Sequence, residues 1–257
     1  MQPQIPEYRN TIFKRKKHPY CLCVFVLNEG LKFQNQIKRL SPYTNDVDII
    51  IADGGSTDGS TNHSFLRKYN VSSLLVKIGR GGLSSQMRIA FDYILRKKYQ
   101  GIIVMDGNNK DDPSAIPSFV DSLKNGFDHI QGSRFVKGGK AINTPLLRYI
   151  GIRFIHAPLI SMASQFRYTD TTNGFRAYSA KMLSDNKVNV FRNIFSKYEL
   201  HYYLSIRSSQ LGYRLKEIPT VREYPANVKI PTKISPIKGN ITILVTLFRS
   251  VFGRYNP

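Results

Sequence analysis

The sequence predicts an α/β fold in which a mostly parallel sheet is flanked by helices. In the first half of the chain, four short apolar runs alternate with stretches of helical spacing, which is the pattern of a doubly wound sheet. Three of these runs are followed directly by turns rich in Asp, Asn and Gly. Because such sheets bind ligands beyond the carboxyl ends of their strands, these turns predict a nucleotide site at the switch point of the sheet.

The four runs are expected to form buried strands, because their apolar residues occupy successive rather than alternating positions. They cover residues 21–27, 47–52, 71–78 and 102–105. Helical spacing follows three of them, at about 31–42, 84–98 and 113–125. The helix at 84–98 is opened by a glycine-rich turn that lacks the spacing of a dinucleotide fingerprint, and no GKS or GKT phosphate loop occurs in the sequence.

The second half of the chain is expected to complete the sheet. It contains a short strand at 128–131, a mostly apolar helix at 145–167, a helix at 198–211 and an edge strand at 214–221. Pro158 is expected to bend the long helix, because proline has no N–H to donate. Gly212 is expected to cap the next helix. A polar turn at 170–176 lies between the two helices.

The chain is expected to divide into three parts. Residues 1–19 are predicted to be a loose basic arm, 20–224 a single catalytic domain, and 225–257 a basic tail. The tail ends in an apolar run at 241–252 that is too short to span a bilayer. We expect this run to lie on a membrane surface beside basic residues. The alternative is an ordinary terminal helix packed on the core.

The formal net charge of +21 indicates an anionic partner. Nucleic acid, a phospholipid surface and phosphorylated substrates all fit that charge. We expect no nucleic acid, because no motif of an RNA-binding or DNA-binding module is present and the acidic turns would repel a phosphate backbone. Two cysteines, Cys21 and Cys23, are interpreted as core thiols in a reducing compartment. The sequence therefore favours a cytoplasmic protein bound peripherally to an anionic membrane.

The turn after the strand at 102–105 is the central candidate for chemistry. Asp106 and Asn108 lie two residues apart, and their oxygens could share one hard cation that carries phosphate oxygens. The structural alternative is a helix start, with Asp112 as the N-cap and Pro113 at the first helical position. The two interpretations are compatible, because the cap leaves Asp106 available.

Six motifs, in this order, carry a resemblance to a known family. They are VFVLNEG at 24–30, IIIADGGSTDGS at 49–60, VMDGNNKDDP at 104–113, QGSRFVKGG at 131–139, DTTNGFRAYS at 170–179 and GYRLKEIP at 212–219. The chain resembles the inverting GT-A glycosyltransferases of family two over residues 20–238. Within that family it is most similar to polyprenyl-phosphate sugar synthases of the dolichyl-phosphate mannose or glucose type.

The resemblance implies roles for individual residues. It implies that Asn28, Glu29 and Asp53 hold the base and ribose of a nucleotide-sugar. It places Asp106 and Asn108 at the metal-binding Asp-x-Asp motif of the family, for Mg²⁺ or Mn²⁺. It further implies that two arginines, Arg134 and Arg148, hold the acceptor phosphate, and that Asp170 lines the sugar pocket.

Three positions depart from the family pattern. Gly54 stands where a second aspartate is common, Asn108 replaces the second aspartate of the metal motif, and Lys110 replaces a metal-contacting Gln. Asn is neutral and Lys brings a positive charge, so a divalent cation is expected to bind weakly. Lys110 is expected to replace part of its charge against the diphosphate.

Several of these residues also have structural interpretations. Asp53 could cap a helix beginning after Ser56, and Arg134 could be a surface arginine. Arg148 could extend along an apolar helix to reach water. Arg88, which follows the glycine-rich turn, is expected to face the nucleotide.

The predicted function is transfer of a sugar from a UDP- or GDP-linked donor to polyprenyl phosphate at the membrane surface. A lipid phosphate is already an anion and needs no strong base, so Arg134, Arg148 and Lys110 would position it and the donor. If the acceptor is instead a saccharide hydroxyl on a lipid-linked or capsular glycan, Asp170 is the candidate base. A non-catalytic basic binding protein is the remaining alternative.

Overall fold

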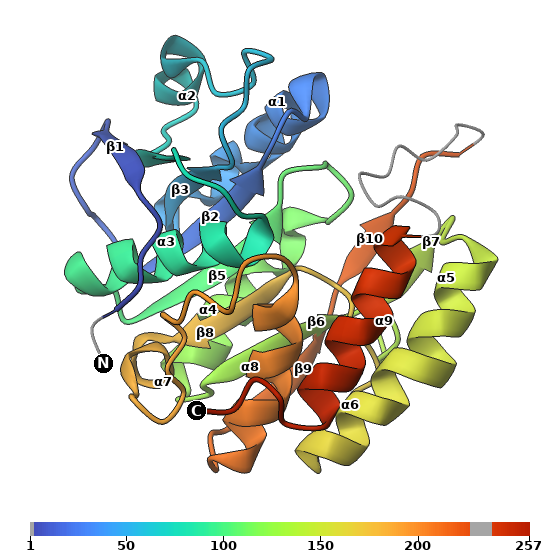
Figure 1. The fold of residues 1–257 in the computed structure, drawn as a ribbon. Helices are drawn as coiled ribbons and strands as arrows, with labels where there is room; N and C mark the ends of the chain where they lie inside the picture. The colour runs from blue at the N-terminus through green and yellow to red at the C-terminus, as the bar shows by residue number, and fades with distance from the viewer. Residues whose placement is uncertain (1–2, 227–237) are drawn as a thin grey trace.

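In the computed structural model, which describes residues 3–226 and 238–257, an eight-stranded sheet forms the centre of the molecule (Figure 1). Its strands follow the order β1-β4-β3-β2-β5-β8-β6-β9. They are β1 Tyr8–Ile12, β4 Ser73–Lys77, β3 Asp48–Asp53, β2 Tyr20–Val26, β5 Gly101–Asp106, β8 Arg176–Ser179, β6 His129–Ser133 and β9 Leu215–Pro219. A second, two-stranded sheet pairs β10 Val221–Glu223 with β7 Lys140–Ile142.

The parallel core of this sheet confirms the predicted fold class. Strands β4, β3, β2 and β5 are mutually parallel, and the strand order reverses between β2 and β5. In all four strands, the observed ends lie within three residues of the predicted ends. The strand β8, which pairs antiparallel with both β5 and β6, was not predicted. It is only four residues long, and its sequence contains no apolar run that would predict a strand.

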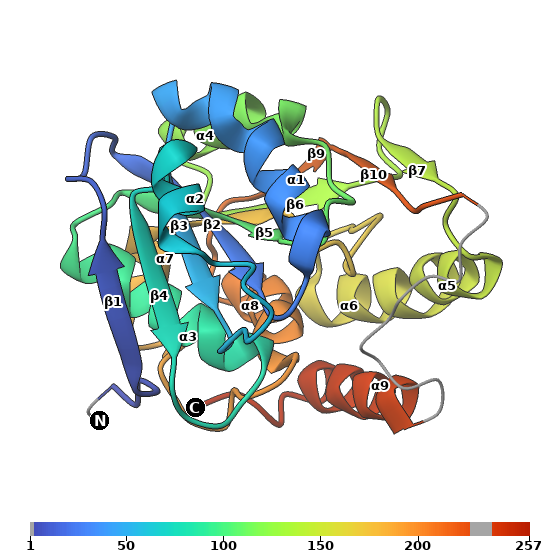
Figure 2. The ribbon, with the colours of Figure 1, turned by 90° about the horizontal axis from the view of Figure 1, so that it is seen from above.

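Helices cover both faces of the sheet (Figures 1 and 2). One face packs against α3 Leu83–Arg96, α7 Ala180–Ser184 and α8 Glu199–Gln210, and the other against α1 Gly30–Leu40 and α4 Ile116–Lys124. Alternate residues of β2 serve the two sides: Cys21 and Cys23 belong to one apolar cluster, and Leu22 and Val24 to the other. This explains why the strand is apolar at every position.

Short helices complete the polypeptide. They are η1 Ser41–Asn45, α2 His63–Lys68, η2 Pro113–Ala115, α5 Leu146–Ile150, the π-helix η3 Gly151–His156 and α6 Ala157–Ser164. Asp112 caps η2 by accepting a hydrogen bond from the Ser114 N–H, as predicted. Asn62, and not Asp53, caps α2, the helix that follows β3.

The N-terminal segment is not the loose arm that its composition suggested. Residues Tyr8–Ile12 form β1, which pairs antiparallel with β4 at one edge of the sheet. The basic tract that follows is also tied down, because Asp48 accepts hydrogen bonds from the N–H groups of Lys17 and His18. Backbone pairing of β1 was invisible in a segment whose side chains are mostly polar.

The C-terminal run forms α9, Lys238–Val251, which packs on α8 and α6. Leu247 is fully buried there, in a small apolar cluster with Ile160 and Tyr202. Phe248 and Phe252 point outward and are 45% and 74% exposed. Part of the predicted tail, 227–237, lies outside the described residues. No helix within the described ranges is both long and apolar enough to cross a membrane.

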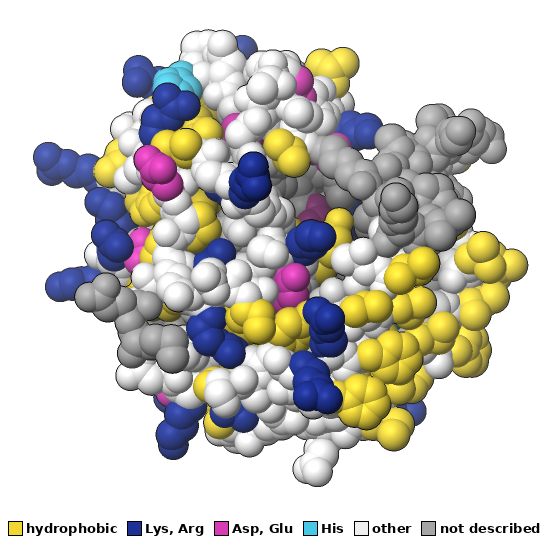
Figure 3. All heavy atoms as spheres, viewed as in Figure 1, with side chains coloured by type: hydrophobic (Ala, Val, Ile, Leu, Met, Phe, Trp, Pro, Cys, Tyr) yellow, Lys and Arg dark blue, Asp and Glu magenta, His cyan; other side chains and the backbone are white. Residues whose placement is uncertain are grey.

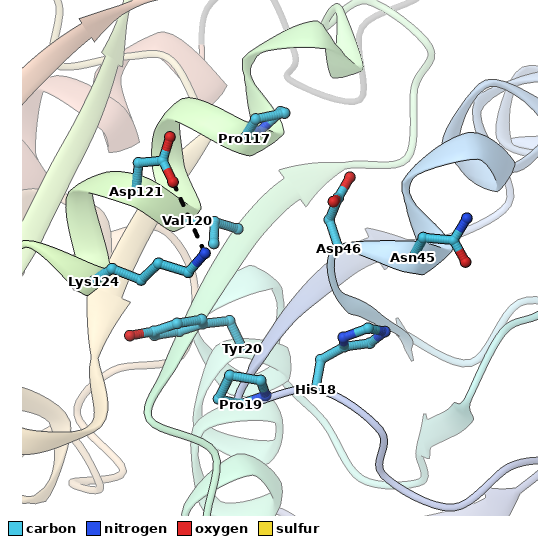
Figure 4. Close-up of a pocket in the computed structure, with 9 residues that line it drawn as sticks. All are labelled: His18, Pro19, Tyr20, Asn45, Asp46, Pro117, Val120, Asp121 and Lys124. Atoms are coloured by element: carbon cyan, nitrogen blue, oxygen red, sulfur yellow. Dashed lines mark ion pairs between the residues drawn. The ribbon is translucent and has the colours of Figure 1, made fainter.

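One pocket in the described part of the chain lies away from the predicted site. It has a volume of about 250 Å³ and lies at the amino end of β2, between Tyr20, Asp46 and the α4 residues Val120 and Lys124 (Figure 4). None of the predicted site residues lines it.

Candidate active site

The register of the sheet brings three predicted loops to one edge. Val26 pairs with Asp53, and Phe25 pairs with Asp106, so the carboxyl ends of β2, β3 and β5 are level. Backbone hydrogen bonds continue this alignment into the loops: Gly54 N–H donates to the Val26 carbonyl, and Gly107 N–H to the Phe25 carbonyl, both at 2.8 Å. This is the switch point at which an open α/β sheet binds its ligand.

Asp53 organises the loop that follows β3. Its Oδ1 accepts hydrogen bonds from the backbone N–H groups of Gly55 and Ser56 at 3.0 and 2.8 Å, and from the Ser56 hydroxyl. Its Oδ2 accepts from the Thr61 hydroxyl. The side chain is buried, so its observed role is to shape the loop. Direct contact with a nucleotide remains a prediction.

The first loop is joined to the second. The Asn28 Oδ1 accepts a hydrogen bond from the Thr57 N–H at 2.8 Å, and the Asn28 N–H donates to the Ser56 hydroxyl. Asp58 accepts from the Gly30 N–H. Glu29 stands at the N-cap of α1 and is partly exposed. Asn28, Glu29 and Asp53 therefore lie in two joined loops at this edge of the sheet, and their role in holding a base and ribose stays a prediction.

Gly54 has a packing reason that explains the departure from a second aspartate. A Cβ at this position would lie 3.2 Å from the Gln86 Nε2 and 3.3 Å from Leu27. Gln86 itself donates to the carbonyls of Val26 and Ala52 at 3.0 and 2.9 Å. This side chain bridges the ends of β2 and β3, and a Cβ at position 54 would press on it and on Leu27.

Arg88 is not brought to these loops. It is buried on α3, and its Nη1 donates to the carbonyl of Gln4 in the N-terminal segment. Burial lowers its pKa, an effect that nearby Glu199 opposes. The expectation that Arg88 faces the nucleotide is therefore not supported by its position, because Arg88 lies two residues after the bridging residue Gln86 and so on nearly the opposite side of α3.

A residue of β10 that was not predicted contacts the Asp106 loop. Arg222 forms ion pairs with Asp111 at 2.5 Å and with Asp106 at 3.1 Å. Asn108 donates weakly to Asp106 at 3.4 Å. Gly174 lies against this carboxylate, since a Cβ there would be 2.9 Å from the Asp106 Oδ1. Two loops far apart in sequence thus meet on one side chain.

Three cations converge on Tyr224. Lys110 lies 4.9 Å from the centre of its ring, Arg222 5.9 Å, and Arg148 donates to its hydroxyl at 3.0 Å. Burial alone would raise the pKa of Tyr224, but the charges of Arg222 and Arg148 lower it. Burial lowers the pKa of Lys110, and its cationic neighbours Arg222 and Arg148 add to that effect. The cations around Tyr224 therefore favour an anionic group at this place.

A local signal for Arg222 and Tyr224 was present in the sequence. Arg222, Glu223 and Tyr224 directly follow the strand expected at 214–221, and residues two apart on a strand share a face. An arginine and a tyrosine on one face near a nucleotide site are candidates for anion binding. Both residues fall inside the predicted domain 20–224, but no role was predicted for them.

Arg134 and Asp170 are paired with each other. Two side-chain hydrogen bonds join them, from Arg134 Nε at 2.6 Å and from Nη2 at 2.9 Å, and the Arg134 backbone N–H donates to Asp170 as well. The exposed fractions of the side chains are 1% and 0%. Burial would raise the pKa of Asp170, but the Arg134 charge lowers it below its ordinary value. A carboxylate held in this way is a poor general base.

Two further side chains, Glu217 and Arg176, hold the backbone of the loop that contains Asp170. Glu217 accepts hydrogen bonds from the backbone N–H groups of Thr169 and Asp170. The fully buried Arg176 donates to the carbonyls of Thr171, Asn173 and His201. Both are positioning residues for the loop.

The residues present fit a weakly held divalent cation. Mg²⁺ and Mn²⁺ are commonly bound by one or two protein groups together with substrate phosphates, and Asp106 with the Asn108 Oδ1 could supply that share. The Asp106 carboxylate is already in an ion pair with Arg222. Among the described residues there is no group of three or more His, Cys, Asp or Glu side chains suited to a metal.

Comparison with known proteins identifies relatives over about two thirds of this chain. Residues 21–189 match the family model described as Glycosyl transferase family 2. The chain is 26% identical over 183 residues to an undecaprenyl-phosphate mannosyltransferase of Micrococcus luteus, covering 70% of this chain and 74% of that protein. It is 26% identical over 180 residues to a polyprenol monophosphomannose synthase of Mycolicibacterium smegmatis. That match covers 67% of this chain and 65% of that protein.

The fold has solved counterparts. The crystal structure of glucosyl-3-phosphoglycerate synthase from Mycobacterium tuberculosis, in complex with Mn²⁺, uridine diphosphate and phosphoglyceric acid, superimposes with a TM-score of 0.64. The identity is 13%, and the match covers 90% of this chain and 78% of that one. Because the family match spans most of the chain and the fold agrees, this protein belongs to glycosyl transferase family 2 and is a glycosyltransferase of the GT-A fold.

Proposed function

We propose that this enzyme transfers a sugar, with inversion, from a UDP- or GDP-linked donor to polyprenyl phosphate at the cytoplasmic face of a membrane. The observation that carries the proposal is the cluster of Lys110, Arg148 and Arg222 around Tyr224, next to Asp106. Two anionic groups, the leaving diphosphate and the acceptor phosphate, account for such a concentration of positive charge. The named activities of the relatives point to the same acceptor class.

The chemistry follows from where charge develops. As the sugar leaves the nucleotide, the diphosphate gains negative charge, and fixed cations near it stabilise the transition state more than the ground state. Lys110 and Arg148 form no ion pair with a carboxylate among the described side chains, so their charge is available to anionic substrates. A divalent cation held by Asp106 and Asn108 would neutralise a further part of the diphosphate charge.

The state of Asp170 favours a phosphate acceptor over a hydroxyl acceptor. A hydroxyl must lose its proton as it attacks, which requires a carboxylate of suitable basicity. Asp170 is buried in its pair with Arg134, with a lowered pKa. A lipid phosphate attacks as an anion, so the enzyme needs only to position it. We therefore assign Asp170 to the support of Arg134, and Arg134 and Arg148 to the acceptor side.

An assay of sugar transfer tests the proposal. Radiolabelled UDP- and GDP-sugars are incubated with the enzyme and polyprenyl phosphate in detergent, and label in the organic phase is counted. We expect transfer with polyprenyl phosphate and none with the matching polyprenol, which lacks the anion. Transfer to a saccharide acceptor in the absence of any lipid phosphate would contradict the proposal and restore the hydroxyl mechanism.

A further inference from the structure

Arg222 is fixed between a buried carboxylate and a partly exposed one. Its Nη1 contacts the Asp111 Oδ2 at 2.5 Å, and its Nη2 contacts the Asp106 Oδ2 at 3.1 Å. The side chain of Asp111 is fully buried, whereas that of Asp106 is 28% exposed. One arm of the guanidinium is therefore anchored inside the protein, and the other reaches the residue that faces the donor site.

The backbone around Arg222 is equally well held. Strand β10 pairs with β7, and on its other side it is joined to the Asp106 loop. The Asp112 N–H donates to the Val221 carbonyl at 3.0 Å, and the Glu223 N–H donates to the Lys110 carbonyl at 2.8 Å. Little ordering of Arg222 is needed when a ligand arrives, which favours binding to a preorganised group.

Positive side chains outnumber the carboxylates around Asp106. Lys110, Arg148 and Arg222 supply three positive charges, against the two negative charges of Asp106 and Asp111. A divalent cation would have to bind beside these like charges and share the Asp106 carboxylate with Arg222. A diphosphate, in contrast, would meet a positive site even before any metal binds.

We propose that Arg222 is a built-in cation for the donor diphosphate, positioned by Asp111, and that it competes with a divalent metal for Asp106. The inference rests on the proposed function, because it concerns the donor of that reaction. It predicts that the enzyme binds nucleoside diphosphates without metal. The alternative is that Arg222 is only a buried structural pair for Asp111.

Two binding measurements with opposite expected signs separate these alternatives. UDP and GDP are titrated by calorimetry in excess chelator, and Mn²⁺ alone is titrated by electron paramagnetic resonance, against wild type and Arg222→Gln. Losing a charged hydrogen-bond donor should weaken diphosphate binding about 10-fold or more. Mn²⁺ should bind more tightly to the variant, because Asp106 is released. If Arg222 has only a structural role, its replacement will not strengthen Mn²⁺ binding. Mn²⁺ binding by Arg222→Gln that is no tighter than that of wild type would therefore overturn the proposal.

Two control variants distinguish the loss of the Arg222 charge from misfolding. Arg222→Gln leaves Asp111 buried and unpaired, so Asp111→Asn/Arg222→Gln, which removes both charges, is measured in parallel and should show the same two effects. Arg39→Gln is the matched control, because Arg39 contacts Asn109 and Asp112 of the same loop but not Asp106. It should change neither affinity.

The outcomes also separate this inference from the proposed function. If wild type binds UDP or GDP only when Mn²⁺ is present, the built-in cation is wrong while sugar transfer can stand. If wild type binds neither diphosphate with or without Mn²⁺, the donor assignment itself is wrong, and the proposed function falls with it.

Discussion

Individual ionisable residues take their roles from burial and from their partners. Arg134 and Asp170 were each predicted to act on substrate, yet they lie within a bidentate contact that fills most of the hydrogen-bonding capacity of the carboxylate. Removing one member of such a buried pair costs about 3 to 5 kcal/mol of stability, because the other charge is left uncompensated. Asp170 therefore fixes the direction of Arg134.

Glu217 gives a prediction about pH. Burial raises its pKa to about 7, although the N–H groups of Asp170 and Thr169 partly oppose this. An acid whose pKa is higher in the folded state takes up a proton on folding between its unfolded value, 4.5, and about 7. Its contribution to stability is therefore lost as pH rises through that window, by at most about 3 kcal/mol.

Glu217→Gln tests this directly. The amide keeps an oxygen for Thr169 and Asp170 but cannot ionise. Urea unfolding of both proteins at pH 5 and pH 8 should show that wild type loses more stability on going to the higher pH than the variant does. Equal losses would mean that Glu217 titrates at its ordinary pKa and does not link the loop to pH.

At the scale of single elements, the segment from α5 to α6 shows how one proline reshapes a helix. Pro158 lies in the first turn of α6, where its missing N–H costs least, and the preceding turn widens into the π-helix Gly151–His156. The predicted bend at Pro158 thus takes the form of a change in helix type. The wider turn brings Arg153 within 5.0 Å of the Phe135 ring, close to Arg134.

Helix α9 has two faces that a pair of substitutions can tell apart. Leu247 is fully buried against α8 and α6, while its neighbour Phe248 is 45% exposed. Leu247→Ala should lower the free energy of unfolding by about 2 to 4 kcal/mol. Phe248→Ala should cost less than about 1 kcal/mol, although it removes more atoms. Similar losses in urea unfolding would show that α9 does not pack on the core in this way.

At the scale of the whole molecule, exposed apolar side chains gather on one face (Figure 3). They come from α5, η3, α6, α9 and the residue that follows α9: Leu146, Leu147, Tyr149, Ile150, Phe154, Ile155, Met162, Ile241, Val245, Phe248 and Phe252. Arg148 of the site lies on the same helix as Leu147. A lipid acceptor could thus reach the cationic cluster from this face, which supports the proposed membrane attachment.

The basic arm does not share that face. The tract at 14–17 follows β1, at one edge of the sheet, whereas α5, α6 and α9 lie towards the other edge (Figures 1 and 2). The basic tract and the apolar face therefore lie towards opposite edges of the sheet.

Vesicle binding tests the apolar face. The exposed fractions of Leu147, Phe154 and Phe252 are 85%, 72% and 74%. Replacing all three by Ser should reduce co-sedimentation with anionic vesicles about 10-fold or more, since each inserted side chain contributes on the order of 1 kcal/mol or more. Leu31→Ser, at a residue 74% exposed on α1, is the control and should not matter. Undiminished binding of the triple variant would place the membrane contact elsewhere.

Much of this protein could be predicted from local pattern. Buried parallel strands are apolar at every position, so β2, β3, β4 and β5 were identifiable from the chain alone. Their polar turns were equally visible, and the parallel register then required that Asn28, Asp53 and Asp106 meet at one edge. Order along the chain and strand direction were sufficient for that inference.

Only the tertiary structure decided which charges face one another. Arg222 reaches Asp106 across 116 residues, and Arg134 reaches Asp170 across 36. No periodicity encodes such pairs, because an ion pair depends on side-chain distances of a few ångströms between segments that come together only on folding. The same reason separates Arg88 from the nucleotide loops and joins Lys110 to Arg148. The sequence determined where the site lies, and folding determined which of its residues are free to act on a substrate.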